Sequence, residues 1–427
     1  MKYVSEVFFL SEYHIKGGRA LEGEVEISGA KNAALPILAA SIVAGGESLL
    51  TSCPRISDVD SMTEILSSLG CRISMNDGTL SVDSSDMGSC SIPHHLMEKM
   101  RSSVFLAGSL LARCGEATIS RPGGCNIGSR PIDIHIEGLK RLGAEVKAGE
   151  DTIKIKGSHL RGCDIPLPYP SVGATENIMM AALAAEGATR IINSAREPEI
   201  VDLQEYINKC GGKVSGAGTG VITVEGRRRL RGCRHRIMPD RIEAGTYMLM
   251  ALGTGGRIFL KNIGLEHLKA LVDIMTEAGF YIAEDKDGIM CMSSGNEKIR
   301  RRISTGPYPG FPTDLQPQMT AFLTTRGKGS VMEENVFEKR TEYGNELKKM
   351  GADIEISEKQ VIIRNNNILY GARVEAKDLR GGAALMIAGF MAEGETIISN
   401  TKYIKRGYSR PVEKIRGLGG QITENER

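Results

Sequence analysis

A cysteine held between glycines, with an arginine and an aspartate just beyond it, is the part of this sequence best suited to chemistry. Residues 121–133 read RPGGCNIGSRPID, so Cys125 stands between two glycine-bearing turns and is followed by Arg130 and Asp133. Glycine adopts backbone conformations closed to other residues, and a nearby arginine lowers the pKa of a thiol. The loop could hold a reactive thiol against a ligand, but a packed, inert cysteine in a tight turn explains the loop alone equally well.

Polar residues also stand at the starts of six apolar segments. Lys31 heads one of them, and because a buried lysine without a partner is costly, an anionic ligand is the better explanation for it. Asp314 begins another, where it could be a helix cap or a base for a substrate hydroxyl. The others are Asn32, Arg101, Ser171, Thr175, Asp240, Arg241, Glu243, Asp378 and Arg380. Each alone is more simply a cap or a surface charge, and only their recurrence favours an anion site at helix starts.

The elements that must position these residues follow a repeat. The six apolar segments, rich in small residues and predicted to be buried helices, cover residues 28–45, 101–115, 171–187, 240–255, 313–327 and 376–394. Each is followed by a β-rich run, an amphipathic run and then a glycine before a further β-rich run. These glycines, about 70 residues apart, are Gly70, Gly143, Gly211, Gly279, Gly351 and Gly419. Six βαβαββ-type units predict three per domain, with helices inside and sheets outside.

Composition limits the possible classes of protein. A chain of 427 residues exceeds the size at which one hydrophobic core keeps growing, so two domains are expected. The net charge of +2 gives no support for nucleic-acid binding, and no stretch approaches the eighteen or so apolar residues of a membrane span. Nine scattered cysteines, without a CxxC pair or metal-type spacing, are expected to be reduced thiols in the cytoplasm.

Several of these stretches together resemble one family, the UDP-N-acetylglucosamine 1-carboxyvinyltransferases, which are enolpyruvyl transferases. The resemblance runs from about Tyr13 to the C-terminus with the repeat spacing intact. The motifs are SGAKNAALP (28–36), PGGCNIGSRPIDIH (122–135), SVGAT (171–175), AREPEIVD (195–202), PDRIE (239–243), FPTD (311–314), VFEKR (336–340), DLR (378–380) and RGY (406–408).

The resemblance implies an α/β fold, a two-domain inside-out α/β barrel in which each domain has pseudo-threefold symmetry. The first domain would cover residues 31–238 and carry the Cys125 loop. The second would cover residues 1–30 and 239–427, and the active site would lie in the cleft between them. The six repeated units agree with this arrangement, whereas the oligomeric state stays open.

The implied reaction transfers the enolpyruvyl group of phosphoenolpyruvate to the 3′-hydroxyl of UDP-N-acetylglucosamine and releases phosphate, without a metal or organic cofactor. By the resemblance, Cys125 would donate a proton to the methylene carbon of phosphoenolpyruvate, and Asp314 would act on the sugar hydroxyl. The residues matching phosphoenolpyruvate contacts and further cleft arginines are Lys31, Asn32, Arg130, Arg340, Arg380 and Arg406, of which Lys31 and Arg406 would also be catalytic. Arg130 and Asp314 also match nucleotide-sugar contacts, and the remaining expected substrate contacts are Arg101, Pro131, Ile132, Asp133, Ile134, Ser171, Val172, Gly173, Val336 and Asp378.

Two alternatives compete with this hypothesis. A shikimate-pathway enolpyruvyl transferase would keep the repeats but lacks the Cys125 loop. A catalytically silent UDP-sugar-binding paralogue would be favoured by the loss of Lys31, Cys125, Asp314 or Arg406, and all four are present. One departure from the family is Tyr169, which stands where some members have a lysine and puts one uridine-side contact in doubt.

Overall fold

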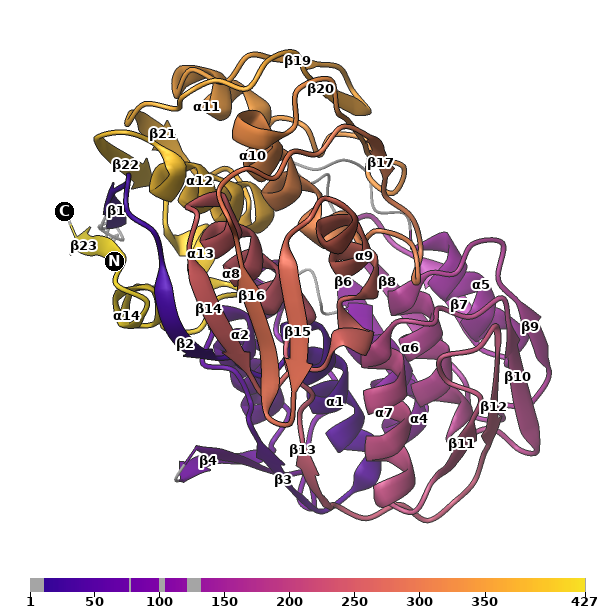
Figure 1. The fold of residues 1–427 in the computed structure, drawn as a ribbon. Coiled ribbons are helices and arrows are strands. Elements are labelled where there is room, and N and C mark those ends of the chain that lie inside the picture. Colours follow the sequence, from indigo (N-terminus) through magenta and orange to yellow (C-terminus); the bar gives the residue numbers. More distant parts are fainter. Residues whose placement is uncertain (1–10, 77, 100–103, 121–131, 427) are drawn as a thin grey trace.

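The computed structural model describes residues 11–76, 78–99, 104–120 and 132–426, which form two lobes (Figure 1). Each lobe has its own hydrophobic core. One core gathers buried side chains between Ala30 and Ile237, and the other gathers those of residues 13–27 and 242–422. The chain therefore passes between the two cores twice, and the two crossings touch at a β-bridge between Gly29 and Pro239.

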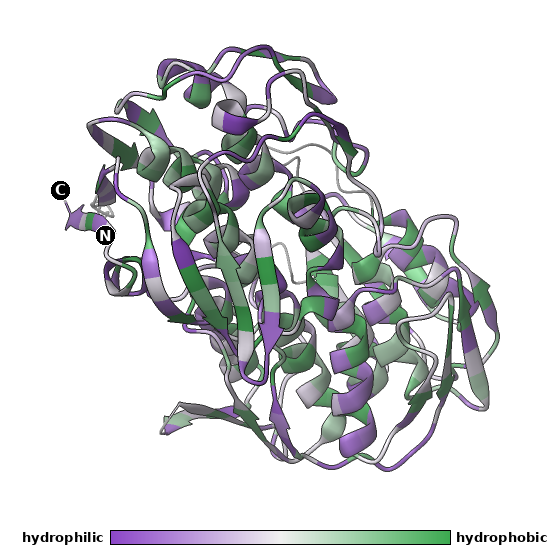
Figure 2. Ribbon diagram, viewed as in Figure 1, coloured by the Kyte–Doolittle hydropathy of each residue, from purple (hydrophilic) through white to green (hydrophobic). Residues whose placement is uncertain are grey.

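Three helices fill the centre of each lobe. They are α1 (Lys31–Ala44), α4 (Leu106–Cys114) and α6 (Val172–Ala182) in the first, and α8 (Arg241–Gly253), α10 (Gln316–Arg326) and α12 (Leu379–Met391) in the second. Within each lobe the three pack on one another, and they are largely apolar (Figure 2). Small residues allow this close approach: a Cβ on Gly108 would lie 2.1 Å from the carbonyl oxygen of Asn177.

Six small sheets cover these helices. In the first lobe their strand orders are β13 (Arg234–Arg236), β3 (Glu47–Thr51), β5 (Thr79–Asp83), β4 (Arg72–Asn76); β6 (Glu116–Ser120), β8 (Thr152–Lys156), β7 (Glu145–Ala148); and β11 (Lys213–Ser215), β12 (Val221–Glu225), β10 (Ala188–Ile192), β9 (Asp164–Pro166). In the second lobe they are β15 (Tyr281–Asp285), β16 (Gly288–Met292), β14 (Arg257–Lys261), β2 (Glu22–Glu26); β17 (Arg302–Ser304), β18 (Val331–Glu333), β20 (Gln360–Ile363), β19 (Ile354–Ile356); and β21 (Arg373–Glu375), β22 (Glu395–Ser399), β1 (Ser11–Lys16), β23 (Gln421–Glu426).

The sheets share one pattern. Each of the five four-stranded sheets joins antiparallel strands to a single parallel edge strand, as where β13 pairs with β3, while the three-stranded sheet is antiparallel throughout. Buried and outward-facing residues alternate along strands such as β8, as expected when one face of a sheet packs on helices and the other meets water. The fold is therefore mixed α/β, with six small sheets around two sets of central helices.

The remaining helices lie between the sheets and connect them. They are α2 (Ser57–Ser68), α3 (His94–Lys99), α5 (Asp133–Arg141), α7 (Pro198–Lys209), α9 (Lys269–Glu277), α11 (Tyr343–Lys349), α13 (Lys402–Lys405), α14 (Pro411–Gly417) and the short 3₁₀ turns η2 (Leu265–His267) and η3 (Thr313–Leu315). The six repeat glycines all follow such helices and have φ between 79° and 100°. Because this left-handed region suits glycine, the structure confirms the helix ends predicted from the repeat.

The cysteines differ from the sequence-based expectation. Cys90 and Cys114 form a disulfide, so the prediction that all nine cysteines are reduced thiols is wrong for this pair. The bond joins the loop before α3 to the end of α4, two segments whose closeness depends on the tertiary fold and leaves no spacing signature in the sequence.

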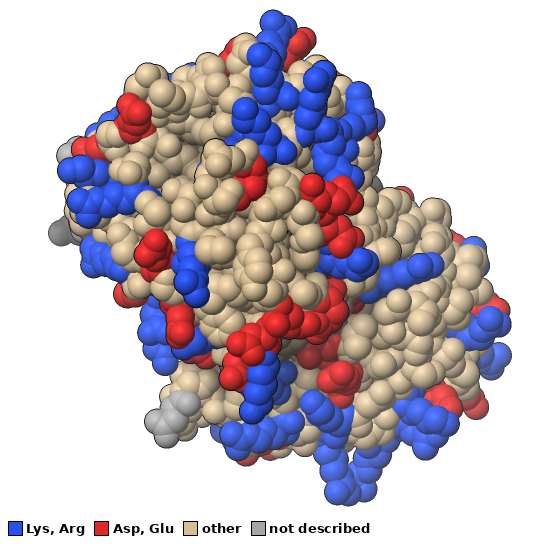
Figure 3. Space-filling model, viewed as in Figure 1, with Lys and Arg blue, Asp and Glu red and all other residues tan. Residues whose placement is uncertain are grey.

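Charges of both signs are spread over the face shown in Figure 3, where neither sign covers a whole lobe. Among the described residues, no helix is both long enough and apolar enough to cross a bilayer.

Candidate active site

One carboxylate lies between two cations at the junction of the lobes. The Nζ atom of Lys31, at the start of α1, is 2.5 Å from Oδ2 of Asp58, in the first turn of α2. From the second lobe, Arg406 donates through Nε to Oδ1 of Asp58 at 2.9 Å and through a terminal nitrogen to Oδ2 at 3.3 Å. The side chains of Lys31 and Asp58 are 13% and 8% exposed, whereas that of Arg406 is 45% exposed, so the cluster is buried on the side of the first lobe and open on the side of Arg406.

The electrostatics of this first cluster depend on burial. Burial lowers the pKa of Lys31 against the attraction of Asp58, and the charges of Arg380 and Arg406 add to the fall. Burial also opposes the charge of Asp58, but Lys31 and Arg406 outweigh it and hold the pKa of Asp58 below its usual value. The carboxylate therefore compensates two cations in a site that is otherwise suited to an anion.

A second carboxylate, Asp314 in η3, also lies between cations. Arg340 donates to its Oδ1 at 3.0 Å, and Arg380, in the first turn of α12, donates to Oδ2 at 2.7 Å. Asn32, in the first lobe, donates to the same Oδ2 at 3.3 Å, which makes a second link between the lobes. Burial raises the pKa of Asp314, but Arg380 and Arg340 outweigh burial and hold that pKa well below its usual value. Asp314 is ionised at any physiological pH.

The structure thus brings six of the residues expected at the site, Asp314 among them, into two neighbouring clusters. Lys31 and Asn32 are consecutive at the start of α1, and each reaches a different carboxylate. Arg340, Arg380 and Arg406 come from three separate segments of the second lobe.

Another group of expected contacts lies at the adjoining starts of α5 and α6. Ser171 is the N-cap of α6 and accepts a hydrogen bond from the backbone N–H of Ala174. A Cβ on Gly173 would lie 3.0 Å from the ring of His135, so the two helix starts touch. The expected residues in this group are Ile132, Asp133, Ile134, Ser171, Val172 and Gly173.

Two further expected contacts have structural roles that are visible here. Asp378 is the N-cap of α12, and its Oδ1 accepts from the N–H groups of Arg380 and Gly381 at 2.9 and 3.0 Å. The backbone N–H of Val336 donates to Glu334 at 2.8 Å. The expected residues Arg101, Cys125, Arg130 and Pro131 lie outside the described residues.

Asp58 is the site residue that sequence reasoning missed. It belongs to the stretch SDVD, where acidic residues in a first helical turn have an ordinary explanation as partners of the helix dipole. Only the fold shows that Asp58 faces Lys31 and Arg406. A buried ion pair also joins the two lobes: Nε of Arg241, in α8, donates to Oε1 of Glu199, in α7, at 2.9 Å.

Glu176, in α6, is a buried carboxylate that makes no ion pair with any residue the structure describes. The residue is 1% exposed, and its Oε2 atom has no hydrogen-bond partner among the described residues. Burial, with Glu199 and Glu197 nearby, raises the pKa of Glu176 well above its usual value. Because the pKa of Glu176 is raised in the folded protein, the contribution of this group to the free energy of unfolding is complete below its unfolded-state pKa. That contribution declines as the pH rises toward the folded-state pKa.

The change Glu176→Gln is therefore expected to raise the midpoint of thermal unfolding more at pH 8 than at pH 5, because glutamine removes the cost of keeping this group neutral. Differential scanning calorimetry at the two pH values measures the effect. Glu186→Gln, an exposed carboxylate beyond the same helix, should shift the midpoint little at either pH. An equal gain for Glu176→Gln at both pH values would contradict the assignment.

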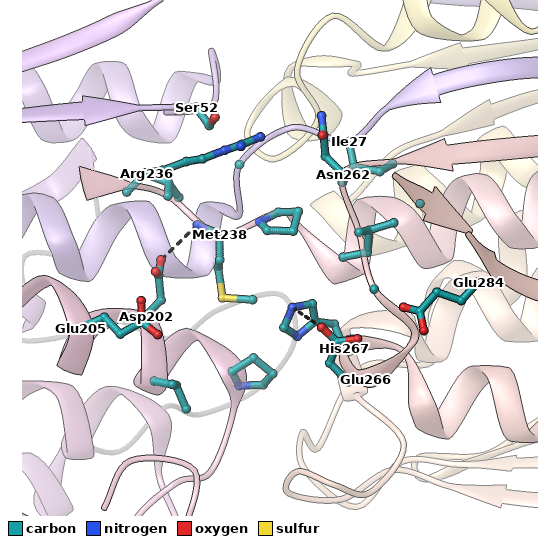
Figure 4. A pocket seen from close by; sticks show the side chains of 18 of the residues that line it. Ile27, Ser52, Asp202, Glu205, Arg236, Met238, Asn262, Glu266, His267 and Glu284 are labelled. Atoms are coloured by element: carbon teal, nitrogen blue, oxygen red, sulfur yellow. Dashed lines mark hydrogen bonds and ion pairs between the residues drawn. The ribbon is translucent and has the colours of Figure 1, made fainter. Parts of the chain in front are cut away.

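A separate cavity of about 790 Å³ lies where the two chain crossings meet (Figure 4). Its lining includes Asp202, Arg236, Met238 and His267, and it includes none of the residues of the two carboxylate clusters. The candidate active site is therefore distinct from this cavity.

Comparison with known proteins identifies the class first. The family described as EPSP synthase (3-phosphoshikimate 1-carboxyvinyltransferase) matches residues 15–415. The crystal structure of the enolpyruvyl transferase NikO from Streptomyces tendae has a TM-score of 0.89 at 20% identity and covers 98% of this chain and 100% of that one. EPSP synthase from Acinetobacter baumannii has a TM-score of 0.73 at 18% identity, covering 97% and 100%. The fold is that of the enolpyruvyl transferases.

Relatives of similar sequence identify the family within the class of enolpyruvyl transferases. UDP-N-acetylglucosamine 1-carboxyvinyltransferase 2 of Caldanaerobacter subterraneus subsp. tengcongensis is 46% identical over 414 residues, which cover 97% of this chain and 99% of the relative. The UDP-N-acetylglucosamine 1-carboxyvinyltransferase of Halothermothrix orenii is 46% identical over 416 residues, covering 97% and 100%. The chain belongs to the UDP-N-acetylglucosamine 1-carboxyvinyltransferase family.

Proposed function

We propose that this protein transfers the enolpyruvyl group of phosphoenolpyruvate to the 3′-hydroxyl of UDP-N-acetylglucosamine and releases phosphate, the first committed step of peptidoglycan precursor synthesis. The observation that carries the proposal is the pair of carboxylate–cation clusters at the lobe junction. Lys31 and Arg406 reach one point from opposite lobes, and Asp314 lies close by between two buried arginines. Family membership supplies the identity of the donor and the acceptor.

In this proposal the cations bind phosphoenolpyruvate through its phosphate and carboxylate, because the planar guanidinium group of arginine can donate two hydrogen bonds to the oxygens of either anion. Cys125 protonates the methylene carbon, which leaves an oxocarbenium-like centre. The sugar 3′-oxygen attacks this centre while Asp314, kept ionised by Arg340 and Arg380, accepts the hydroxyl proton. Loss of phosphate and of a methyl proton then restores the enol ether.

Asp58 has a role that follows from its contacts. Its carboxylate contacts both Lys31 and Arg406, so a phosphate-bearing anion must compete with it for the same donors. Because the two cations come from different lobes, this exchange would couple anion binding to the contact between the lobes. The contact with Asp58 holds the charged ends of Lys31 and Arg406 close together.

The change Asp58→Asn is accordingly expected to tighten competitive inhibition by inorganic phosphate roughly tenfold, since a charge-assisted hydrogen bond contributes about 1.5–3 kcal/mol and 1.4 kcal/mol is tenfold. The inhibition constant against phosphoenolpyruvate measures it. Asp60→Asn, an exposed carboxylate on the same helix, serves as the matched control. A weaker inhibition by phosphate in Asp58→Asn would mean that Asp58 only holds the structure together.

The finer assignments belong to the same proposal. Residues 31–238 would form one barrel domain, and residues 1–30 with 239–427 the other, each an inside-out barrel of three repeated units. The starts of α5 and α6, with Arg101, Arg130, Pro131, Val336 and Asp378, would contact the nucleotide sugar. The reaction would need no cofactor, and the protein would work in the cytoplasm without a nucleic-acid or membrane partner.

Acceptor specificity tests the proposed function. Phosphate release is followed after the protein is mixed with phosphoenolpyruvate and either UDP-N-acetylglucosamine or shikimate 3-phosphate. Phosphate release is expected when the acceptor is UDP-N-acetylglucosamine and not when it is shikimate 3-phosphate. Release with shikimate 3-phosphate instead would assign the protein to the shikimate pathway, and release with neither would favour a silent UDP-sugar-binding protein.

A further inference from the structure

Two of the unbonded cysteines lie side by side, away from the proposed active site. Cys210 directly follows α7, and Cys233 directly precedes β13, 23 residues later. The Sγ atom of Cys210 donates a hydrogen bond to the Sγ atom of Cys233 at 3.4 Å. Cys210 is only 4% exposed, whereas Cys233 is half-buried and so open to small reagents. The pair therefore has one accessible sulfur and one protected sulfur within reach of it.

The surroundings favour a thiolate at Cys233. The Nζ atom of Lys209 lies 3.1 Å from Nδ1 of His235. The other ring nitrogen of His235, Nε2, lies 2.9 Å from Oδ1 of Asp202. The hydrogen bond from Cys210, with help from His235 and Lys209, lowers the pKa of Cys233 to about 7 although burial opposes this. The same hydrogen bond and burial raise the pKa of Cys210. Cys233 also donates a hydrogen bond through its sulfur to the carbonyl oxygen of Tyr206, 4.0 Å away.

We infer that Cys210 and Cys233 are a reversible dithiol–disulfide pair that reacts with small linear disulfides of the glutathione type, with Cys233 as the attacking sulfur. The Cys233 thiolate attacks one sulfur of the reagent, forms a mixed disulfide and expels one thiolate. Cys210 then loses its proton and attacks the sulfur of Cys233, which expels the second thiolate. The two cysteines are oxidised by two electrons, and one reagent disulfide is reduced to two thiols.

The bond would fasten α7 to β13 close to a chain crossing. Asp202, in α7, accepts a hydrogen bond at 3.1 Å from the backbone N–H of Met238, which lies just beyond β13 (Figure 4). A disulfide between Cys210 and Cys233 would close the chain over β11 and β12 and add a covalent tie beside this hydrogen bond. Since such a cross-link restricts the unfolded chain, the oxidised protein should unfold at a higher temperature than the reduced one.

The test is to incubate the folded protein with excess glutathione disulfide, alkylate the remaining thiols under denaturing conditions and map the tryptic peptides by mass spectrometry. Cleavage after Lys209 and Arg231 places the two cysteines in the short peptides 210–213 and 232–234. The expected product is a cross-link between these peptides, two hydrogen atoms lighter than their sum, which dithiothreitol removes.

Single variants separate the two roles. Cys210→Ser should leave Cys233 as a lasting mixed disulfide with glutathione, and Cys233→Ser should leave Cys210 unmodified. Cys163→Ser, which removes a half-buried cysteine whose pKa is raised by burial, should leave the cross-link unchanged. Recovery of both Cys210 and Cys233 as alkylated thiols in the wild-type protein, while Cys163 carries glutathione, would overturn the inference.

Discussion

Replacing Cys125 with alanine is expected to lower turnover about 10²–10⁴-fold, the range that a positioned general acid contributes. The variant should remain folded, because a glycine-rich loop loses only one small side chain. Cys125 lies outside the described residues, so the expectation depends on its sequence setting, between Gly123, Gly124 and Gly128 and five residues before Arg130. The turnover number with both substrates saturating measures the effect.

The same thiol should be the target of the epoxide fosfomycin, as the family resemblance implies. Incubation of the wild-type protein with fosfomycin and UDP-N-acetylglucosamine is expected to inactivate it and to add the drug at Cys125, as peptide mapping would show. Cys163→Ala serves as the matched control and should behave like the wild type in both assays. Full turnover in Cys125→Ala would remove this cysteine from proton transfer, whether or not fosfomycin modifies it.

The second large effect is expected from Asp314→Asn, which keeps the shape of the side chain and removes the base. Turnover should again fall about 10²–10⁴-fold. The pKa of Asp314 is held well below its usual value by Arg380 and Arg340 against burial. Its charge is therefore present above the unfolded-state pKa near 3.9 and is lost only as pH falls through the lower folded-state pKa. An acidic limb between pH 5 and 7 in the activity profile must then come from another group.

This change also has a structural cost that must be measured separately. Arg340 and Arg380 are buried and would keep their charges without the carboxylate. The loss should be smaller than the roughly 3–5 kcal/mol typical of a broken buried pair, since the Asp314 side chain is 23% exposed. Thermal unfolding and turnover are compared with those of Asp273→Asn, an exposed carboxylate on α9. Near-wild-type turnover in a folded Asp314→Asn would exclude Asp314 as the base.

The repeat made much of the fold predictable. A glycine that ends a helix needs a left-handed backbone, and that need is visible in the sequence as Gly70 and its five equivalents. The apolar segments gave the six central helices for a similar reason, because small residues throughout a helix indicate burial on all sides. The pairing of strands such as β1 with both β22 and β23 joins the two ends of the chain, and no local pattern indicates it.

At the site, the sequence identified side chains but not their partners. Lys31 was conspicuous because a buried lysine at the head of an apolar helix needs a partner, and Asp314 was selected by the family resemblance. Asp58 was not conspicuous, because an aspartate in a first helical turn already has an ordinary explanation. Its contact with Arg406 spans 348 residues and both lobes, and only the packed structure reveals it.

The central claim is that cations from both lobes bind one small anion. Calorimetric titration of phosphoenolpyruvate, without UDP-N-acetylglucosamine so that no transfer takes place, tests it in Lys31→Gln and Arg406→Gln, with Lys405→Gln, whose cation pairs with Glu424, as the control. The account predicts that each of the first two variants binds at least about 30-fold more weakly, the equivalent of 2 kcal/mol, and that the control does not. Unchanged affinity in either Lys31→Gln or Arg406→Gln would contradict the shared site.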